Sequence, residues 1–129
     1  MLYLDTSALV KLCRIEVETK ALIDWLAKAP GDWVTSGLSE VELTRAISLA
    51  DPAALTHVPG VLAQCDRLEL DRQVRADAAA LRPPALRTLD ALHLATALEL
   101  APDLEAFVTY DERLAAAVRG NGLAVVAPS

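Results

Sequence analysis

Short apolar segments alternate along the chain with longer segments whose apolar residues recur every three or four positions. The first kind is typical of buried strands, and the second is typical of helices that pack on one face. The strand candidates are residues 2–5, 33–36, 66–70, 106–111 and 123–127. The helix candidates are residues 8–13, 16–29, 40–50, 51–64, 72–82, 88–100 and 112–122. The pattern predicts strands and helices in alternation.

This alternation indicates how the elements are arranged in space. Strands separated by helices form parallel sheets, and the helices cover both faces of the sheet. We therefore predict an α/β fold with a central, mainly parallel sheet of four or five strands. The chain has 129 residues, a usual size for one domain, so residues 1–129 are expected to form a single domain.

Short polar side chains mark the expected helix starts. Thr6 or Ser7 can cap the first helix, Ser39 the helix after the second strand, and Asp71 the helix after residues 66–70. Pro59-Gly60 interrupts the segment 51–64, which is therefore expected to form either one helix or a pair of short helices.

Composition narrows the function classes. The net charge of -6 argues against a general nucleic-acid binder, which would carry a basic face. Cys13 and Cys65 are too few for a disulfide framework and lack zinc-ligand spacing, so both are expected to be reduced core thiols. No basic leader or long apolar stretch is present, so we expect a cytoplasmic protein without a membrane segment.

Two aspartates follow strand candidates. Asp5 ends the first apolar run, and Asp111 ends the segment "AFVTYD". Because ligands gather beyond the carboxyl ends of parallel strands, both carboxylates should open onto the same edge of the sheet.

Two further carboxylates lie in otherwise apolar helices. Glu42 stands in "SEVELTRAI" and Asp90 in "LRTLDALHLATAL". A lone aspartate is a poor choice for a helix interior, although taken alone Asp90 could simply be exposed or act as a cap. Carboxylates that converge repel one another unless a cation shares the site. Hard oxygen ligands suit Mg²⁺ or Mn²⁺, which can activate water against a phosphodiester.

Four segments resemble, in order, the motif blocks of PIN-domain ribonucleases, specifically the VapC-type toxins. These are "YLDTSALVKL", "SEVELTRA", "LRTLDALHLATAL" and "FVTYDERLAAAV". The resemblance implies a three-layer α/β/α sandwich and Mg²⁺- or Mn²⁺-dependent cleavage of a structured RNA, in a tRNA or ribosomal RNA loop. It also implies inhibition by a cognate antitoxin and pairing as a homodimer.

The resemblance assigns the acidic, metal-binding set to Asp5, Glu42, Asp90 and Asp111. It also matches three hydroxyl positions beside the aspartates, namely Thr6, Ser7 and Thr109. A metal-activated water would then attack the phosphodiester in line and leave a 5′-phosphate and a 3′-hydroxyl.

Other polar residues keep alternatives open. Glu40 is a rival to Glu42, but the two lie on different sides of a helix and cannot both face the cluster. His93, one turn after Asp90, is either a partner of the acidic set, a metal ligand or, as we favour, a packed and hydrogen-bonded core histidine. Candidate phosphate contacts are Lys11, Arg14, Arg45 and Arg87, each of which could equally be exposed or pair with a carboxylate.

Other protein classes fit less well. A haloacid-dehalogenase phosphotransferase needs a second aspartate where Ser7 stands, and no glycine-rich turn supports a nucleotide-binding fold. The serious alternative is a catalytically silent PIN domain that binds RNA or a protein partner.

Overall fold

The computed structural model describes residues 1–129 and contains one five-stranded, fully parallel sheet. Its strands are β1 (Leu2–Leu4), β2 (Trp33–Ser36), β3 (Cys65–Leu68), β4 (Ala106–Val108) and β5 (Val125–Val126). They lie in the order β3-β2-β1-β4-β5. The first strand is therefore central, and the residue after it lies at the middle of the carboxyl edge.

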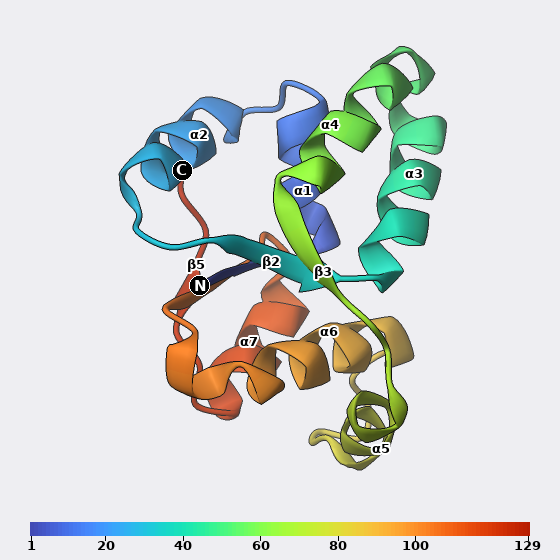
Figure 1. Ribbon diagram of the computed structural model, residues 1–129, viewed down its shortest axis with the longest axis vertical. Helices are drawn as coiled ribbons and strands as arrows, with labels where there is room; N and C mark the ends of the chain where they lie inside the picture. The colour runs from blue at the N-terminus through green and yellow to red at the C-terminus, as the bar shows by residue number, and fades with distance from the viewer.

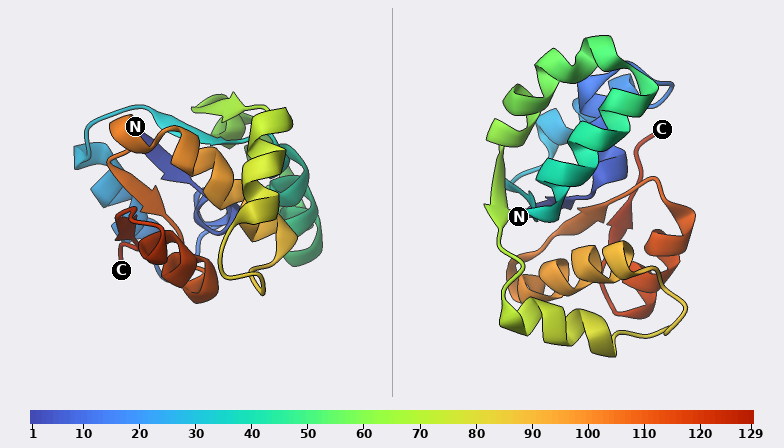
Figure 2. Two further views of the ribbon diagram at one scale, coloured as in Figure 1. Left: turned by 90° about the horizontal axis from the view of Figure 1, so that it is seen from below. Right: turned by 90° about the vertical axis from the view of Figure 1, so that its right-hand side faces the viewer.

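Helices cover both faces of the sheet, which confirms the three-layer α/β/α sandwich (Figure 1; Figure 2). One face carries α1 (Thr6–Cys13), α2 (Thr19–Lys28), α3 (Leu38–Ala50) and α4 (Val58–Ala63). The other face carries α5 (Arg72–Ala80), α6 (Thr88–Glu99) and α7 (Glu112–Gly120). Two 3-10 helices, η1 (Pro52–His57) and η2 (Ala101–Asp103), complete the chain.

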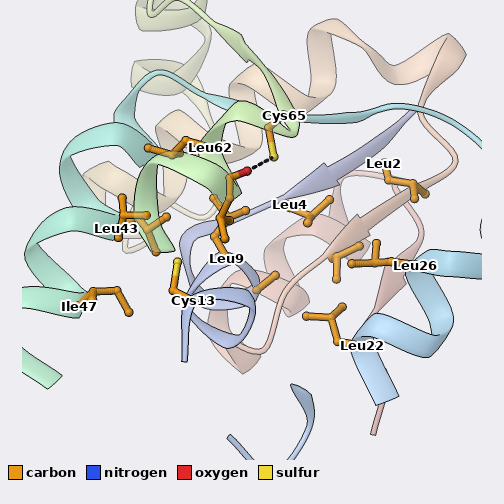
Figure 3. Close-up of a cluster of buried hydrophobic side chains, with 14 of the residues drawn as sticks. Leu2, Leu4, Leu9, Cys13, Leu22, Leu26, Leu43, Ile47, Leu62 and Cys65 are labelled. Carbon is orange, nitrogen blue, oxygen red and sulfur yellow. Dashed lines mark hydrogen bonds between the residues drawn. The ribbon is translucent and has the colours of Figure 1, made fainter. Parts of the chain in front are cut away.

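The central strand divides its side chains between two cores, because successive residues of a strand point to opposite faces. Leu2 and Leu4 join the larger core under α1 to α4, part of which is drawn in Figure 3. Tyr3 joins the smaller core under α6 and α7, where its ring stacks on that of Phe107 with centroids 4.7 Å apart. The same alternation sets the position of the Tyr3 hydroxyl in the candidate site.

Both cysteines are buried free thiols, as expected. Burial raises the pKa of each thiol to about 11, so neither is a reactive thiolate at neutral pH. The Cys65 thiol donates to the carbonyl oxygen of Val61 at 3.9 Å, the contact dashed in Figure 3.

The helix starts differ from expectation in two places. Asp5, and neither Thr6 nor Ser7, caps α1, because its Oδ1 accepts from the backbone N–H of Ala8. Ser39 lies inside α3, buried, and its hydroxyl bonds to that of Thr35 at 2.7 Å. Asp71 caps α5 as predicted.

The segment 51–64 forms two short helices. The division falls between His57 and Val58, and Pro59-Gly60 lies within the first turn of α4. Proline is tolerated there because its missing N–H would have no partner in a first turn. No helix of the structure has both the length and the apolar character needed to cross a bilayer.

Candidate active site

The four predicted carboxylates come from elements that meet at the carboxyl edge of the sheet. Asp5 directly follows β1, and Asp111 lies at the start of α7, after β4. Glu42 belongs to α3, which follows β2, and Asp90 lies in the first turn of α6. Asp90 and Asp111 share one hydrogen-bonded side chain, whereas Asp5 and Glu42 each have hydrogen-bond partners of their own.

Asp5 is the buried member, with only 3% of its surface exposed. Its Oδ1 accepts from the Ser7 hydroxyl at 2.7 Å and from the Ala8 N–H at 3.0 Å, and its Oδ2 accepts from the Thr109 hydroxyl at 2.6 Å. Burial raises the pKa of the Asp5 carboxyl, and these hydrogen bonds offset the rise only in part. No lysine or arginine forms an ion pair with Asp5.

Thr109 and Ser7 join the loop after β4 to the start of α1. Thr109 Oγ1 also accepts from the backbone N–H of Asp111 at 3.1 Å, and Ser7 Oγ accepts from that of Tyr110 at 2.9 Å. The hydroxyls therefore fix the position of Asp5 relative to the backbone of Asp111.

Glu42 lies in a chain of hydrogen bonds that crosses the sheet edge. Its Oε1 accepts from the Thr6 hydroxyl at 2.8 Å and contacts His93 Nε2 at 2.5 Å. His93 Nδ1 lies 2.7 Å from the Tyr3 hydroxyl. If the Tyr3 hydroxyl donates to Nδ1, then Nε2 carries the proton that Glu42 accepts, so every polar atom of the chain has a partner.

This chain sets the charge of Glu42. Burial raises the pKa of the Glu42 carboxyl, but the hydrogen bonds from His93 and Thr6 and the electrostatic attraction of His93 and Arg87 outweigh burial and hold the pKa below its usual value. Glu42 is thus kept ionised. His93, 2% exposed, is the packed and hydrogen-bonded histidine favoured from the sequence, and it is also the direct partner of Glu42.

Glu40 lies elsewhere, in agreement with the expectation that only one of the two glutamates faces the cluster. Its carboxylate is exposed and pairs with Arg67 of β3 at 3.1 Å. Of the two rivals, Glu42 is the one directed toward the sheet edge.

Arg87 bridges the two remaining carboxylates. Its Nε donates to Asp90 Oδ2 at 3.0 Å and its Nη2 to Asp111 Oδ2 at 2.9 Å. The other oxygen of Asp111 caps α7 through the N–H groups of Arg113 and Leu114. We expected a metal to offset the charge of the whole acidic set, but a protein cation offsets that of Asp90 and Asp111.

The other predicted basic contacts are not gathered at the site. Lys11 pairs with Glu16 at 3.2 Å and Glu18 at 2.7 Å, and its ammonium lies 4.6 Å from the centre of the Tyr110 ring. Arg45 is exposed and forms no ion pair. Only Arg87 touches the predicted acidic set.

The donor chemistry suits a hard divalent cation, because all four candidate ligands are carboxylates. As the side chains lie, no group of three or more acidic, histidine or cysteine residues is assembled to hold a metal ion. Arg87 accounts for part of this, since it occupies one oxygen of Asp90 and one of Asp111. Asp5 still has acceptor capacity, because a carboxylate offers about four lone-pair sites and three donors reach it.

Sequence reasoning missed one member of the site. Tyr3 sits in the apolar run "LYL", where nothing distinguishes it from a core tyrosine. The available signal was the strand alternation, which places its side chain on the face covered by α6, the helix that carries His93.

Comparison with known proteins identifies the family of the chain. The family model for the PIN domain matches residues 2–120. The chain is 57% identical over 132 residues to Ribonuclease VapC35 of Mycobacterium tuberculosis, and the match covers 99% of this chain and 97% of that protein.

Solved structures share the fold. A toxin–antitoxin complex from Klebsiella pneumoniae matches with a TM-score of 0.75 at 22% identity, over 100% of this chain and 98% of that one. Mycobacterium tuberculosis VapC20, described as a sarcin-ricin loop cleaving toxin, matches with a TM-score of 0.75 at 14% identity, over 99% of this chain and 100% of that one. The family model and the full-length relative together show that the chain belongs to the PIN domain family, among its VapC members.

Proposed function

We propose that this chain is a metal-dependent endoribonuclease toxin that cuts an exposed loop of a structured RNA and is inhibited by a cognate antitoxin. One observation carries the proposal: Asp5 is a buried carboxylate without a protein counter-ion, on the same sheet edge as three further carboxylates. A domain that only scaffolds a partner gains nothing from this costly arrangement.

The relatives support the same activity. VapC35 is named as a ribonuclease, and VapC20 as a toxin that cleaves the sarcin-ricin loop. A loop suits the present chain, because an acidic protein lacking a basic, aromatic stripe is poorly equipped to bind long single strands.

Asp5, Asp90 and Asp111 would hold Mg²⁺ or Mn²⁺, with Glu42 binding the metal or orienting a water. When bound, such a metal supplies an activated water and stabilises the charge that develops on the phosphodiester. The protein groups do the positioning. Ser7 and Thr109 hold the Asp5 carboxylate, and His93 holds Glu42 in its ionised form.

Arg87 has two possible partners in such a site. Its guanidinium is exposed, and it is the only lysine or arginine group that pairs with the acidic set. If Asp90 and Asp111 held a metal, the Arg87 guanidinium would be free to bind a phosphate of the substrate, a pairing that arginine makes well.

A protein partner is supported by the relatives and by the surface. The solved complex from Klebsiella pneumoniae contains a toxin and an antitoxin. In the present chain, Ile15 and Val17 between α1 and α2 are 91% and 96% exposed. Large apolar side chains left in water are suited to burial against an antitoxin or a second copy of the chain.

The test compares purified wild type with Asp90→Asn on total cellular RNA, with Mn²⁺, Mg²⁺ or EDTA. Discrete fragments with 5′-phosphate ends from the wild type alone, lost in EDTA, would support the proposal. Equal cleavage by both proteins would indicate a contaminating ribonuclease. Binding of RNA without any cleavage would favour the silent PIN domain.

A further inference from the structure

A groove of about 670 Å³ opens beside Asp90, between the segment 82–87 and helix α7. Its rim carries the side chains of Arg82, Arg87 and Arg113. Its apolar lining comes from Pro83, Ala85, Leu86, Ala116 and Ala117. The groove is therefore continuous with the candidate active site through Arg87 and Asp90.

We propose that this groove holds the RNA strand next to the scissile phosphodiester, with backbone phosphates on Arg82 and Arg113 and an unstacked base against the apolar lining. The inference rests on the proposed ribonuclease function and specifies where and how its substrate binds. It adds two substrate-binding residues, Arg82 and Arg113, to the residues of the acidic site.

The charge of the groove supports an anionic ligand. Asp90 is its only acidic residue, and Arg87 already pairs with that carboxylate. The Arg82 and Arg113 side chains form no ion pair, so both guanidinium groups are available. Three arginines around one groove form a local positive field in a protein of net charge -6, and arginine binds phosphate through a planar fork.

The shape of the groove indicates a single strand. Its volume is that of a small-ligand pocket and suits about one or two nucleotides, not a duplex. The apolar lining and the guanidinium planes offer a surface for a base that has left its stack. At one end, Gly120 has no neighbouring atom within 4 Å of the position a Cβ would take, so a strand can pass there.

A second hollow on the other side of Asp111 fits RNA less well. It has a volume of about 660 Å³ and includes Lys11 and Arg119. However, it also contains Glu18, Asp111 and Glu112, and Glu18 already binds the Lys11 ammonium. Its acidic lining would repel a phosphate backbone, which favours the arginine-rimmed groove over this hollow.

The experiment measures binding of a short, fluorescein-labelled, single-stranded RNA of mixed sequence by anisotropy in EDTA, over a series of salt concentrations. Three proteins are compared with wild type: Arg82→Gln/Arg113→Gln, Ala116→Leu, and Lys20→Gln/Lys28→Gln. The last removes two charges from exposed positions of α2, on the other face of the sheet. Leucine at the exposed helical position 116 is compatible with the helix and narrows the groove.

We expect the arginine double variant to bind RNA on the order of tenfold more weakly and to lower the salt slope by about 1.4, the value for two lost phosphate contacts to a single strand. Ala116→Leu should weaken binding several-fold without changing the slope, because it removes space and no charge. The lysine control should remain within twofold of wild type. Unchanged melting temperatures would show that all three variants fold.

If the arginine variant and the lysine control lost RNA affinity equally, the inference would be overturned, since net charge alone would then explain binding. So would wild-type affinity in the arginine double variant, unaltered binding by Ala116→Leu, or no binding by the wild type. None of these outcomes decides the proposed function, which depends on metal-dependent cleavage that Asp90→Asn abolishes. Conversely, a chain that binds RNA through the groove without cutting it would retain the inference and refute the nuclease.

Discussion

The Arg87 guanidinium donates a 2.9 Å hydrogen bond to Asp111, a residue 24 positions away in the sequence. The same guanidinium donates to Asp90, in the first turn of α6. Its hydrogen bond to Asp90 and the charges of both aspartates raise the pKa of Arg87 above its usual value. The arginine thus separates two carboxylates that would otherwise repel each other across the site.

Arg87→Gln should therefore destabilise the metal-free protein, because Asp90 and Asp111 then lose their shared cation. It should also increase the rise in melting temperature that Mn²⁺ produces, since no protein cation competes for the two carboxylates. Thermal melts in EDTA and in millimolar Mn²⁺ measure both effects. Arg45→Gln, at an exposed arginine without an ion pair, is the control and should change neither. An Mn²⁺ shift equal to that of the wild type would show that the arginine and the metal do not compete.

Metal binding should itself stabilise the wild type. A ligand that binds only the folded protein at about 100 times its Kd contributes about 2.7 kcal/mol. We expect millimolar Mn²⁺ to raise the melting temperature of the wild type, EDTA to reverse the rise, and Asp90→Asn to lose most of it. Asp77→Asn, on α5, should keep the full shift. An identical shift in Asp90→Asn would place the bound metal somewhere other than the candidate site.

Asp5→Asn should be at least as stable as the wild type near neutral pH. Burial raises the folded-state pKa of Asp5 above its usual value of 3.8, so ionising this carboxyl costs stability. That cost is absent below the unfolded-state pKa, grows as the pH rises, and is complete above the folded-state pKa. Asparagine can still accept from the Ala8 N–H through Oδ1, and the Thr109 hydroxyl can turn to accept from the amide.

The measurement for Asp5→Asn is the urea midpoint in EDTA at about pH 7 and about pH 4. The urea midpoint of the variant should rise relative to that of the wild type at about pH 7. This difference in midpoint should disappear at about pH 4. Asp66→Asn, at an exposed aspartate of β3, should show no such trend. If the variant were less stable than the wild type by the same amount at both pH values, the charge of Asp5 would not destabilise the folded protein.

Replacing His93 should affect stability and the site together. His93→Phe leaves the Tyr3 hydroxyl and the Glu42 carboxylate each without one hydrogen-bond partner, at a cost of about 1–3 kcal/mol. Tyr3→Phe removes only the hydrogen bond between the Tyr3 hydroxyl and His93 Nδ1, and it should lower the free energy of unfolding by about 1 kcal/mol. Urea denaturation measures both, with His57→Gln, at an exposed histidine, as the control. If His93→Phe proved neutral, the buried chain of hydrogen bonds would not hold Glu42 in place.

Much of the fold could be predicted from the sequence because its local signals agree with one another. The short apolar runs predicted the five strands. The segment "DPAALTHVPGVLAQ" was compatible with one helix or a pair of short helices, and the structure has the pair, with the break before Val58 and not at Pro59-Gly60. The errors at Ser7 and Ser39 share a cause. A serine near a helix start can cap it or bond elsewhere, and hydrogen bonds to the nearby side chains of Asp5 and Thr35 decided the outcome.

The sequence by itself determined which residues stand at the carboxyl edge. Asp5 and Asp111 follow strands, and a parallel sheet brings such positions together whatever the details of packing. Periodicity also separated Glu42 from Glu40, because residues two apart on a helix face different ways. The hard-oxygen character of the site follows from these positions and residue types alone.

Only the tertiary structure decided how these side chains are paired. Arg87 could have been exposed or could have bound either neighbouring carboxylate, and the approach of α7 to the start of α6 makes it bridge Asp90 and Asp111. The link from Tyr3 to His93 joins residues 90 positions apart. Local periodicity fixes the face on which a side chain lies, whereas its partner depends on how helices and strands distant in sequence pack against each other.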